Sequence, residues 1–317
     1  MNMTAKHKLL IVNQFHPETV ASLDSLYDTV HFWDTPEADK ARLLDSLNGI
    51  CNAAASASWF CDDRIYQLPS LKVLACFGVG VDAINFKETN AKHIKVTNTP
   101  DVLNDAVADL AIALILATAR NMINADSFVR NQQWLKGPFP FGQSLAGKTL
   151  GIIGLGRIGE AIVERALPFK LKIAYHNRSP KKVPYAYYAS INELAANCDF
   201  LLNMLPGGAG TAKIINADVF RNLGPKGIFI NVGRGTSVDE PALIEALVTG
   251  LIAGAGLDVY ANEPNVPAGL LKLNNVVLMP HLGSATVQTR REMGNVVMRN
   301  LEAWFSNTPL LTEVNQT

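Results

Sequence analysis

The stretch K-T-L-G-I-I-G-L-G-R-I-G, residues 148–159, determines how this chain is interpreted. It joins an apolar β-rich run, 148–153, to a helical run, 160–167, through the pattern G-x-G-x-x-G. In that context Gly154 permits a tight turn, Gly156 lets backbone N–H groups approach a pyrophosphate, and Gly159 lets the helix pack closely on the strand. Glycines at this spacing also occur in purely structural turns, but the order of strand, loop and helix favours dinucleotide binding.

The sequence around this motif alternates short β-rich runs with stretches of helical spacing. This alternation predicts parallel sheets with crossover helices, here two doubly wound α/β domains. Strands are expected at 8–12, 30–33, 50–53, 73–77, 148–153, 171–175, 200–204, 227–232, 252–257 and 276–279. Helices are expected at 19–27, 39–47, 103–131, 160–167 and 286–305, with Asp101 or Asn104 as the N-cap of the third and a loop at 137–142.

The composition is that of a globular protein, since 48% of the 317 residues are apolar and 28 Lys and Arg balance 28 Asp and Glu. No basic field favours nucleic acid or an anionic membrane as a partner. The four cysteines are scattered without C-x-x-C or metal-ligand spacing, so we expect reduced thiols in a cytoplasmic protein and no metal site. The longest apolar run, 110–119, is too short to span a bilayer, and the apolar run near the N-terminus is too short for a signal peptide.

The cofactor preference is indicated by A-Y-H-N-R-S-P-K-K, residues 174–182. A dinucleotide site usually has Asp or Glu after its second strand, about twenty residues beyond the glycines, to bind the ribose 2′-hydroxyl. This stretch has no acid and carries Arg178 and Ser179 instead, with Asn177 before them. An Arg and a hydroxyl bind a 2′-phosphate that a carboxylate would repel, so NADP(H) is expected. Lys181 and Lys182 are interpreted as helpers or as part of a solvated loop.

Three polar motifs each follow an expected strand of the second series. They are N-V-G-R-G at 231–235, G-L-D-V-Y-A-N-E-P at 256–264 and P-H-L-G-S-A-T at 280–286. Arg234, Glu263 and His281 would therefore lie at the carboxyl edge of one sheet, where α/β sites are found. Taken singly, each residue also fits a structural role in a turn, a loop or a helix cap. Their common position indicates one catalytic cleft.

With these motifs, and with F-G-V-G-V-D-A-I-N at 77–85 and N-T-P-D-V-L-N-D-A-V-A-D-L-A at 98–111, nearly the whole chain resembles the D-isomer-specific 2-hydroxyacid dehydrogenases. Within that family it is most similar to the NADPH-dependent glyoxylate, hydroxypyruvate and hydroxyphenylpyruvate reductases. The resemblance implies a Rossmann dinucleotide-binding domain, 99–286, inserted into a flavodoxin-like substrate domain, 1–98 and 287–317. It also implies a homodimer, and closure of the two domains over the substrate with hinges near 98–100 and 286.

The resemblance further implies a role for each site residue. His281 would protonate the carbonyl oxygen of the substrate, Glu263 would orient its imidazole and favour the charged form, and Arg234 would bind the substrate carboxylate and polarise the ketone. The backbone N–H groups of Val79 and Gly80 would hold the same carboxylate. The residues expected to contact the cofactor are Gly154, Gly156, Arg157, Ile158, Gly159, Asn177, Arg178, Ser179, Leu205, Pro206, Val232, Gly233, Asp258, His281 and Gly283. For Asp258, expected at the nicotinamide carboxamide, a structural hydrogen-bonding role also remains open.

The expected function is NADPH-dependent reduction of a small 2-oxo acid to the D-2-hydroxy acid, and two other functions fit parts of the pattern. An NAD-dependent D-lactate or phosphoglycerate dehydrogenase would share the catalytic residues, but the missing acid after Tyr175 and the length of the chain argue against it. A dinucleotide-sensing, corepressor-like protein could also keep those residues, yet no long tail or docking extension is visible. The substrate side chain is left open, because Trp134, Phe139 and Phe141 could line a pocket or pack in a subunit interface.

Overall fold

The computed structural model describes residues 6–314, and the chain divides into two compact units. The first comprises Met1–Leu103 and Thr286–Thr317, and the second comprises Asn104–Ala285. The sequence predicts divisions at 98/99 and 286/287, and the structure divides the chain at 103/104 and 285/286. Each unit contains its own parallel sheet.

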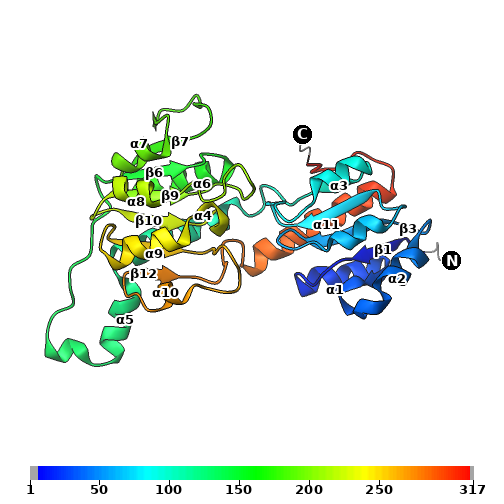
Figure 1. Cartoon of the computed structure of the whole chain (residues 1–317), viewed down its shortest axis with the longest axis horizontal. Helices are drawn as coiled ribbons and strands as arrows, with labels where there is room; N and C mark the ends of the chain where they lie inside the picture. Colours follow the sequence, from blue (N-terminus) through cyan, green and yellow to red (C-terminus); the bar gives the residue numbers. More distant parts are fainter. Residues whose placement is uncertain (1–5, 315–317) are drawn as a thin grey trace. The chain divides into compact units, whose positions relative to one another are not determined.

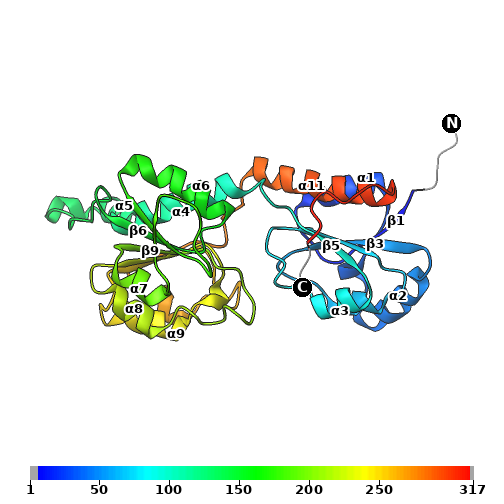
Figure 2. The same ribbon diagram turned by 90° about the horizontal axis from the view of Figure 1, so that it is seen from above.

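The sheet of the first unit follows the order β2-β1-β3-β4-β5 among the described residues. This is the flavodoxin-like order, in which the direction of winding reverses between β1 and β3. Helices α1 and α11 cover one face of the sheet, and α2 and α3 cover the other (Figure 1, Figure 2). The elements are β1 (Lys8–Ile11), α1 (Pro17–Leu26), β2 (Asp28–His31), α2 (Lys40–Leu47), β3 (Cys51–Ala57), β4 (Val73–Phe77), α3 (Phe86–Ala91), β5 (Lys95–Thr97) and α11 (Val287–Phe305).

The sheet of the second unit follows the order β12-β11-β10-β9-β6-β7-β8 within residues 6–314. This is the Rossmann order with one further strand, and its winding reverses between β6 and β9. Helices α4 and α6 lie on one face and α7, α8 and α9 on the other (Figure 2). The elements are α4 (Asn104–Ala119), α5 (Met122–Arg130), β6 (Thr149–Ile153), α6 (Arg157–Ala166), β7 (Lys172–His176), β8 (Ala186–Tyr187), α7 (Ile191–Ala196), β9 (Phe200–Asn203), α8 (Ala217–Leu223), β10 (Ile228–Asn231), α9 (Glu240–Val248), β11 (Gly254–Leu257), α10 (Ala268–Leu271) and β12 (Val276–Leu278).

Both sheets confirm the predicted fold class, two doubly wound α/β domains. The central strands β9, β10 and β11 are buried along their whole length. A parallel sheet covered by helices on both faces has no solvent side, so its strands are continuous apolar runs. Phe220 of α8 packs edge-on against Phe229 of β10, with ring centroids 5.4 Å apart. This burial is the reason that these strands could be located from the sequence.

The single helix expected at 103–131 is wrong, because the segment forms two helices, α4 and α5. Between them Asn121 takes a left-handed conformation with φ 49°, which Asn tolerates better than most residues, and its N–H donates to the carbonyl of Thr118 at 3.2 Å. Residues on α4 are buried in the core of the second unit, whereas no residue of α5 is buried. Among the described residues no single helix is long and apolar enough to cross a membrane, and only the bent pair α4 and α5 meets that test together.

Smaller differences lie at the edges of the sheets. The strand expected at 30–33 is β2, which ends at His31 because Phe32–Asp34 forms a 3-10 turn. The sequence misses β5 and β8, of three and two residues, which are too short for a pattern. The final helix, expected at 286–305, is confirmed as α11, and Thr286 caps it by accepting from the N–H of Thr289 at 3.1 Å.

Candidate active site

The glycine loop lies between β6 and α6, and the fold restricts two of its three glycines. Gly154 has φ +94°, and a Cβ there would lie 3.2 Å from the carbonyl oxygen of Met204. A Cβ on Gly159 would lie 3.1 Å from the carbonyl oxygen of Gly154. Gly156 has φ −105°, and a Cβ there would meet no atom within 4 Å. Nothing in the fold therefore demands glycine at 156, which fits the close approach of a pyrophosphate.

The first turn of α6 offers hydrogen-bond donors at this loop. Gly156 is the N-cap and provides no side-chain bond to the turn. Within residues 6–314 the backbone N–H of Ile158 donates to no acceptor, as is usual for the first residues of a helix without a capping side chain. Unpaired N–H groups and the helix dipole together bind anions. The residues present thus fit the phosphates of a dinucleotide.

The residues after β7 divide into two groups. Asn177 is bonded to the glycine loop, since its Nδ2 donates to the carbonyl of Leu155 at 3.1 Å and its Oδ1 accepts from the N–H of Leu155 at 2.7 Å. Lys181 forms an ion pair with Glu160. Arg178 and Ser179 are exposed, and Arg178 forms no hydrogen bond or ion pair in the part of the chain that the structure describes. Asn177 therefore holds the loop in shape, and Arg178 is the cation available at the strand end.

Arg234 lies in the loop after β10, where two glycines bring it close to neighbouring main chain. A Cβ on Gly233 would lie 2.8 Å from the carbonyl oxygen of Leu205, so this loop packs directly on the segment after β9. A Cβ on Gly235 would lie 1.9 Å from the carbonyl carbon of Tyr260, so it also packs on the segment after β11. The half-buried Arg234 side chain thus extends from a loop in which an added side-chain atom would displace the backbone on either side.

A buried polar network supports this loop from below. The amide of Asn203, at the end of β9, donates to Asn231 Oδ1 at 2.9 Å and to Ser237 Oγ at 2.8 Å. Ser237 Oγ donates to the carbonyl of Arg234 at 2.7 Å, and Asn231 Nδ2 donates to the same carbonyl at 3.2 Å. Asn203, Asn231 and Ser237 are fully or almost fully buried. The sequence did not indicate Asn203 and Ser237 as site residues, and the only signal was a polar residue ending an apolar run, L-L-N at 201–203.

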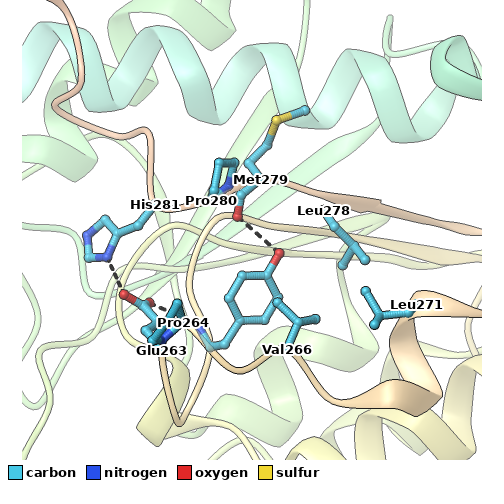
Figure 3. A pocket seen from close by; sticks show the side chains of 9 residues that line it. Glu263, Pro264, Val266, Leu271, Leu278, Met279, Pro280 and His281 are labelled. Carbon is cyan, nitrogen blue, oxygen red and sulfur yellow. Dashed lines mark hydrogen bonds and ion pairs between the residues drawn. The ribbon is translucent and has the colours of Figure 1, made fainter.

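His281 and Glu263 form a hydrogen-bonded pair in the same unit. His281 Nδ1 lies 2.7 Å from Glu263 Oε2, and Glu263 Oε1 accepts from the N–H of Tyr260 at 3.0 Å (Figure 3). Burial of Glu263 favours its neutral form, but the hydrogen bond and charge of His281, the N–H of Tyr260 and the charge of Arg234 outweigh burial and lower its pKa. Glu263 is therefore a carboxylate that fixes one nitrogen of the imidazole and leaves the other nitrogen, Nε2, for chemistry.

Asp258 holds the turn that carries His281. Its Oδ1 accepts from the N–H of Leu282 at 2.6 Å and its Oδ2 from the N–H of Gly283 at 2.9 Å. The N–H of His281 donates to the carbonyl of Asp258 at 2.9 Å, and His281 itself has φ +53°. Burial raises the pKa of Asp258 against the effect of the two N–H donors. These bonds are the structural role that the sequence left open for Asp258.

A cavity of about 280 Å³ adjoins the His281 pair. Figure 3 shows Glu263 and His281 at one end of it, with Leu271 and Leu278 at the other. The hydroxyl of Tyr260 donates to the carbonyl of Met279 at 3.0 Å, and burial raises the pKa of Tyr260 to about 12. One side of the pair formed by His281 and Glu263 is thus apolar. Among residues 6–314, no group of three or more His, Cys, Asp or Glu side chains could hold a metal ion.

Val79 and Gly80 lie in the first unit, directly after β4. Gly78 has φ +143° and packs against Ser58, because a Cβ on Gly78 would lie 1.8 Å from Ser58 Oγ. Asn98 Nδ2 donates to the carbonyl of Val79 at 2.8 Å. The N–H groups of Val79 and Gly80 donate to no acceptor among the described residues. A loop that is fixed in shape and carries two unpaired donors is suited to a carboxylate.

The aromatic residues at 134–141 separate into packed and exposed side chains. Phe139 packs edge-on against Phe128 of α5, with ring centroids 5.2 Å apart. Trp134 is 68% exposed, and Phe141 is fully exposed. In the second unit the segment that carries them extends away from the sheet (Figure 1).

Comparison with known proteins places this geometry in context. Residues 112–283 match the family model described as the NAD binding domain of D-isomer specific 2-hydroxyacid dehydrogenases. The chain is 47% identical to hydroxyphenylpyruvate reductase of Plectranthus scutellarioides and 45% identical to glyoxylate/hydroxypyruvate reductase A HPR2 of Arabidopsis thaliana, in each case over 92% of this chain and 94% of the relative. Its fold is similar, with a TM-score of 0.89 and 41% identity, to an NADPH-dependent glyoxylate/hydroxypyruvate reductase of Sinorhizobium meliloti in complex with NADP and malonate, over 98% of this chain and 97% of that one.

Proposed function

The chain belongs to the D-isomer specific 2-hydroxyacid dehydrogenase family, and from that premise we propose that it reduces a small 2-oxo acid of the glyoxylate or hydroxypyruvate type to the D-2-hydroxy acid with NADPH. The hydrogen bond of 2.7 Å between His281 and Glu263 carries this proposal. An imidazole held by a carboxylate, at the carboxyl edge of a dinucleotide-binding sheet, is the arrangement that general acid catalysis needs. The relatives named above are reductases of 2-oxo acids, which supports the substrate class.

In this proposal His281 holds and delivers the proton. Its Nδ1–H donates to Glu263, so that the proton for the substrate is on Nε2 and is transferred to the carbonyl oxygen during reduction. The negative charge of Glu263 stabilises the imidazolium before transfer. When bound, the reduced nicotinamide supplies the hydride.

The substrate carboxylate is assigned to Arg234 and to the N–H groups of Val79 and Gly80. The planar guanidinium of Arg234 can donate two parallel hydrogen bonds to a carboxylate, which the single ammonium of Lys cannot do. Its charge also draws electrons from the adjacent ketone. The buried network under Arg234 supports this role, because a positioning error of an ångström at a reacting group costs a large factor in rate.

The choice of NADPH over NADH is assigned to Arg178 and Ser179. Arg178 has no acidic partner among residues 6–314, and the strand end carries no carboxylate to repel a 2′-phosphate. Arg178→Ala should therefore lower kcat/KM for NADPH by about 10- to 100-fold, the loss of a charge-assisted hydrogen bond, and leave kcat/KM for NADH nearly unchanged. Lys182→Ala, which removes a neighbouring exposed cation, is the control. A clear preference of the unmodified protein for NADH would refute this assignment.

We further propose that the chain forms a homodimer through the exposed apolar segment of the second unit. Met122, Ile123 and Val129 of α5 are each more than half exposed, and Leu135 is 86% exposed. Large apolar side chains that are exposed together on one segment are typical of an interface. Light scattering should give twice the chain mass, and Leu135→Glu should reduce it to one chain. Val248→Glu, at an apolar residue of α9 that is 65% exposed, should not. A cytoplasmic location stays a prediction from composition.

The direct test of the proposed activity is a panel of 2-oxo acids assayed with each cofactor. Glyoxylate, hydroxypyruvate, pyruvate and hydroxyphenylpyruvate are each offered with NADPH and with NADH, and the loss of nicotinamide absorbance is followed. We expect the highest kcat/KM with NADPH and one of the small acids. Activity confined to pyruvate and NADH would favour a D-lactate dehydrogenase, and no turnover with any pair would refute the enzyme assignment.

A further inference from the structure

An arginine without an acidic partner lies on aromatic rings at the carboxyl edge of the sheet in the first unit. The guanidinium carbon of Arg290, in the first turn of α11, is 5.7 Å from the ring centroid of Phe77 and 5.9 Å from that of Trp59. Phe77 is buried and is also stacked with Phe15 at 5.3 Å. We propose that Arg290 binds an oxygen-bearing substituent on carbon 3 of the 2-oxo acid, and so selects hydroxypyruvate-like substrates over glyoxylate and pyruvate. This inference rests on the proposed function.

The first argument is that Arg290 lacks a counter-ion inside the protein. Its side chain forms no ion pair with a carboxylate in residues 6–314, and burial lowers the pKa of its guanidinium. The next residue, Arg291, is exposed and pairs with Glu18 at 3.3 Å, so the nearby acid is already used. His16 cannot replace an acid, since burial lowers its pKa and its Nδ1 lies 2.9 Å from Thr19 Oγ1.

Burying half of a guanidinium destabilises the protein unless the N–H groups have hydrogen-bond acceptors. Cation–π contacts offset part of the lost hydration but leave the N–H groups of the guanidinium without acceptors. Arginine donates in the plane of its guanidinium, so donors remain available at the edge of the group that rests on the two rings. A ligand oxygen is the missing partner.

The second argument is the position of Arg290 in the sheet. In a doubly wound sheet, ligands bind outside the carboxyl ends of the strands where the order reverses, which in this unit is between β1 and β3. Trp59 follows β3 and is 52% exposed, and Phe77 is the last residue of β4. Phe77 leads directly into Gly78, Val79 and Gly80.

Arg290 and the carboxylate loop therefore belong to the same edge of the same unit. Gly78 packs on Ser58, which places the Trp59 segment beside the loop with the two unpaired N–H groups. If Val79 and Gly80 hold the carboxylate of the substrate, the guanidinium beside Phe77 can meet an oxygen one carbon beyond the ketone. Glyoxylate has no carbon 3, and pyruvate has only a methyl group there, so neither offers such an oxygen.

The test compares kcat/KM for hydroxypyruvate, pyruvate and glyoxylate at saturating cofactor. Arg290→Met keeps the length of the side chain and removes its donors. We expect it to lower kcat/KM for hydroxypyruvate by about 10- to 100-fold and that for glyoxylate and pyruvate by less than about threefold. Arg290→Lys keeps the charge but loses the planar fork, so its kcat/KM for hydroxypyruvate should lie between those of Arg290→Met and the unmodified protein. Arg291→Met is the matched control and should leave the ratios of the three substrates unchanged.

Two results would overturn this inference and leave the proposed function standing. One is an unchanged ratio of kcat/KM for hydroxypyruvate to kcat/KM for pyruvate in Arg290→Met. The other is an equal loss of kcat/KM with all three acids, which would indicate a structural role. KM for NADPH and the melting temperature of each variant report on folding, and Arg290→Lys carries the test if Arg290→Met does not fold. Absence of turnover of all three acids by the unmodified protein would overturn the proposed function and this inference with it.

Discussion

Replacing Glu263 with Gln tests the role of the carboxylate without removing its bulk. Glu263 Oε2 accepts from His281 Nδ1 at 2.7 Å, and Oε1 accepts from the N–H of Tyr260 at 3.0 Å. Gln has a single acceptor oxygen, so it can satisfy one of these donors, and it carries no charge to stabilise an imidazolium. A charge-assisted hydrogen bond contributes about 1.5–3 kcal/mol. The His281 and Glu263 side chains are 40% and 32% exposed, so solvent screening weakens their interaction. We therefore take the lower end of that range, about 1.5 kcal/mol, as the contribution of this hydrogen bond.

A free energy of about 1.5 kcal/mol corresponds to about a tenfold change in rate. Glu263→Gln should therefore lower kcat/KM about tenfold, because the imidazole loses the carboxylate that orients it and stabilises its charged form. The pKa of Glu263 is lowered, so its stabilising charge is present above the usual glutamate range and is lost only as pH falls through the lowered value. The effect of Glu263→Gln should therefore be fully present near neutral pH, where Glu263 is ionised, and should diminish as pH falls through that lowered value.

The assay is the initial rate of NADPH oxidation with glyoxylate as a function of pH. Glu240→Gln is the control, because Glu240 Oε1 accepts from the N–H of Ala261 at 2.8 Å, one residue beyond the Tyr260 bond. Glu240 is the first residue of α9, and Glu240→Gln removes a similar carboxylate that is bonded to the same loop without removing the partner of His281. An unchanged kcat/KM in Glu263→Gln, or an equal loss in Glu240→Gln, would refute the reasoning.

Three further substitutions separate cofactor binding from stability. Gly156→Ala should leave the melting temperature unchanged, because its Cβ meets no protein atom within 4 Å, and should raise KM for NADPH by about tenfold; an unchanged KM would contradict a phosphate at this residue. Gly235→Ala should lower the free energy of unfolding in urea by about 1–3 kcal/mol, since the added Cβ would lie 1.9 Å from the carbonyl carbon of Tyr260. It should also lower kcat, because Arg234 would move. An unchanged free energy of unfolding and an unchanged kcat would count against the packing argument. Ser237→Ala should cost about 1–3 kcal/mol by leaving the fully buried Asn203 amide with one partner fewer, and a loss within experimental error would show that the network is replaceable.

The sequence predicts the glycine loop and most strands because their causes are local. The strands of the second unit are buried on both faces and are therefore apolar runs, and the loop needs Gly154 because of its own φ of +94°. The helix break at Asn121 was missed for the opposite reason. The apolar spacing continues from α4 into α5, but only α4 has a sheet to pack against, and this depends on the rest of the fold.

The roles of polar residues were harder to predict than their positions. Asn177 and Asp258 lie in recognisable motifs, yet their side chains are bonded to the main chain of Leu155 and of residues 282 and 283. Those partners are about 22–25 residues away in sequence, and no spacing rule specifies them. The separation is larger for Arg290, since its ring partner Phe77 lies 213 residues earlier in the chain, and only the packing of α11 in the first unit brings them together.

The backbone segments that carry the three catalytic candidates are held in register by main-chain contacts. Gly233 packs on Leu205, Gly235 packs on Tyr260, and the N–H of His281 is bonded to the carbonyl of Asp258. Each contact joins the segment after one strand to the segment after its neighbour. The side chains of Arg234 and His281 can therefore be replaced without disturbing these main-chain contacts. Loss of activity with an unchanged melting temperature at those two positions would be a chemical effect, whereas the same loss at Gly233 or Gly235 would come with a loss of stability.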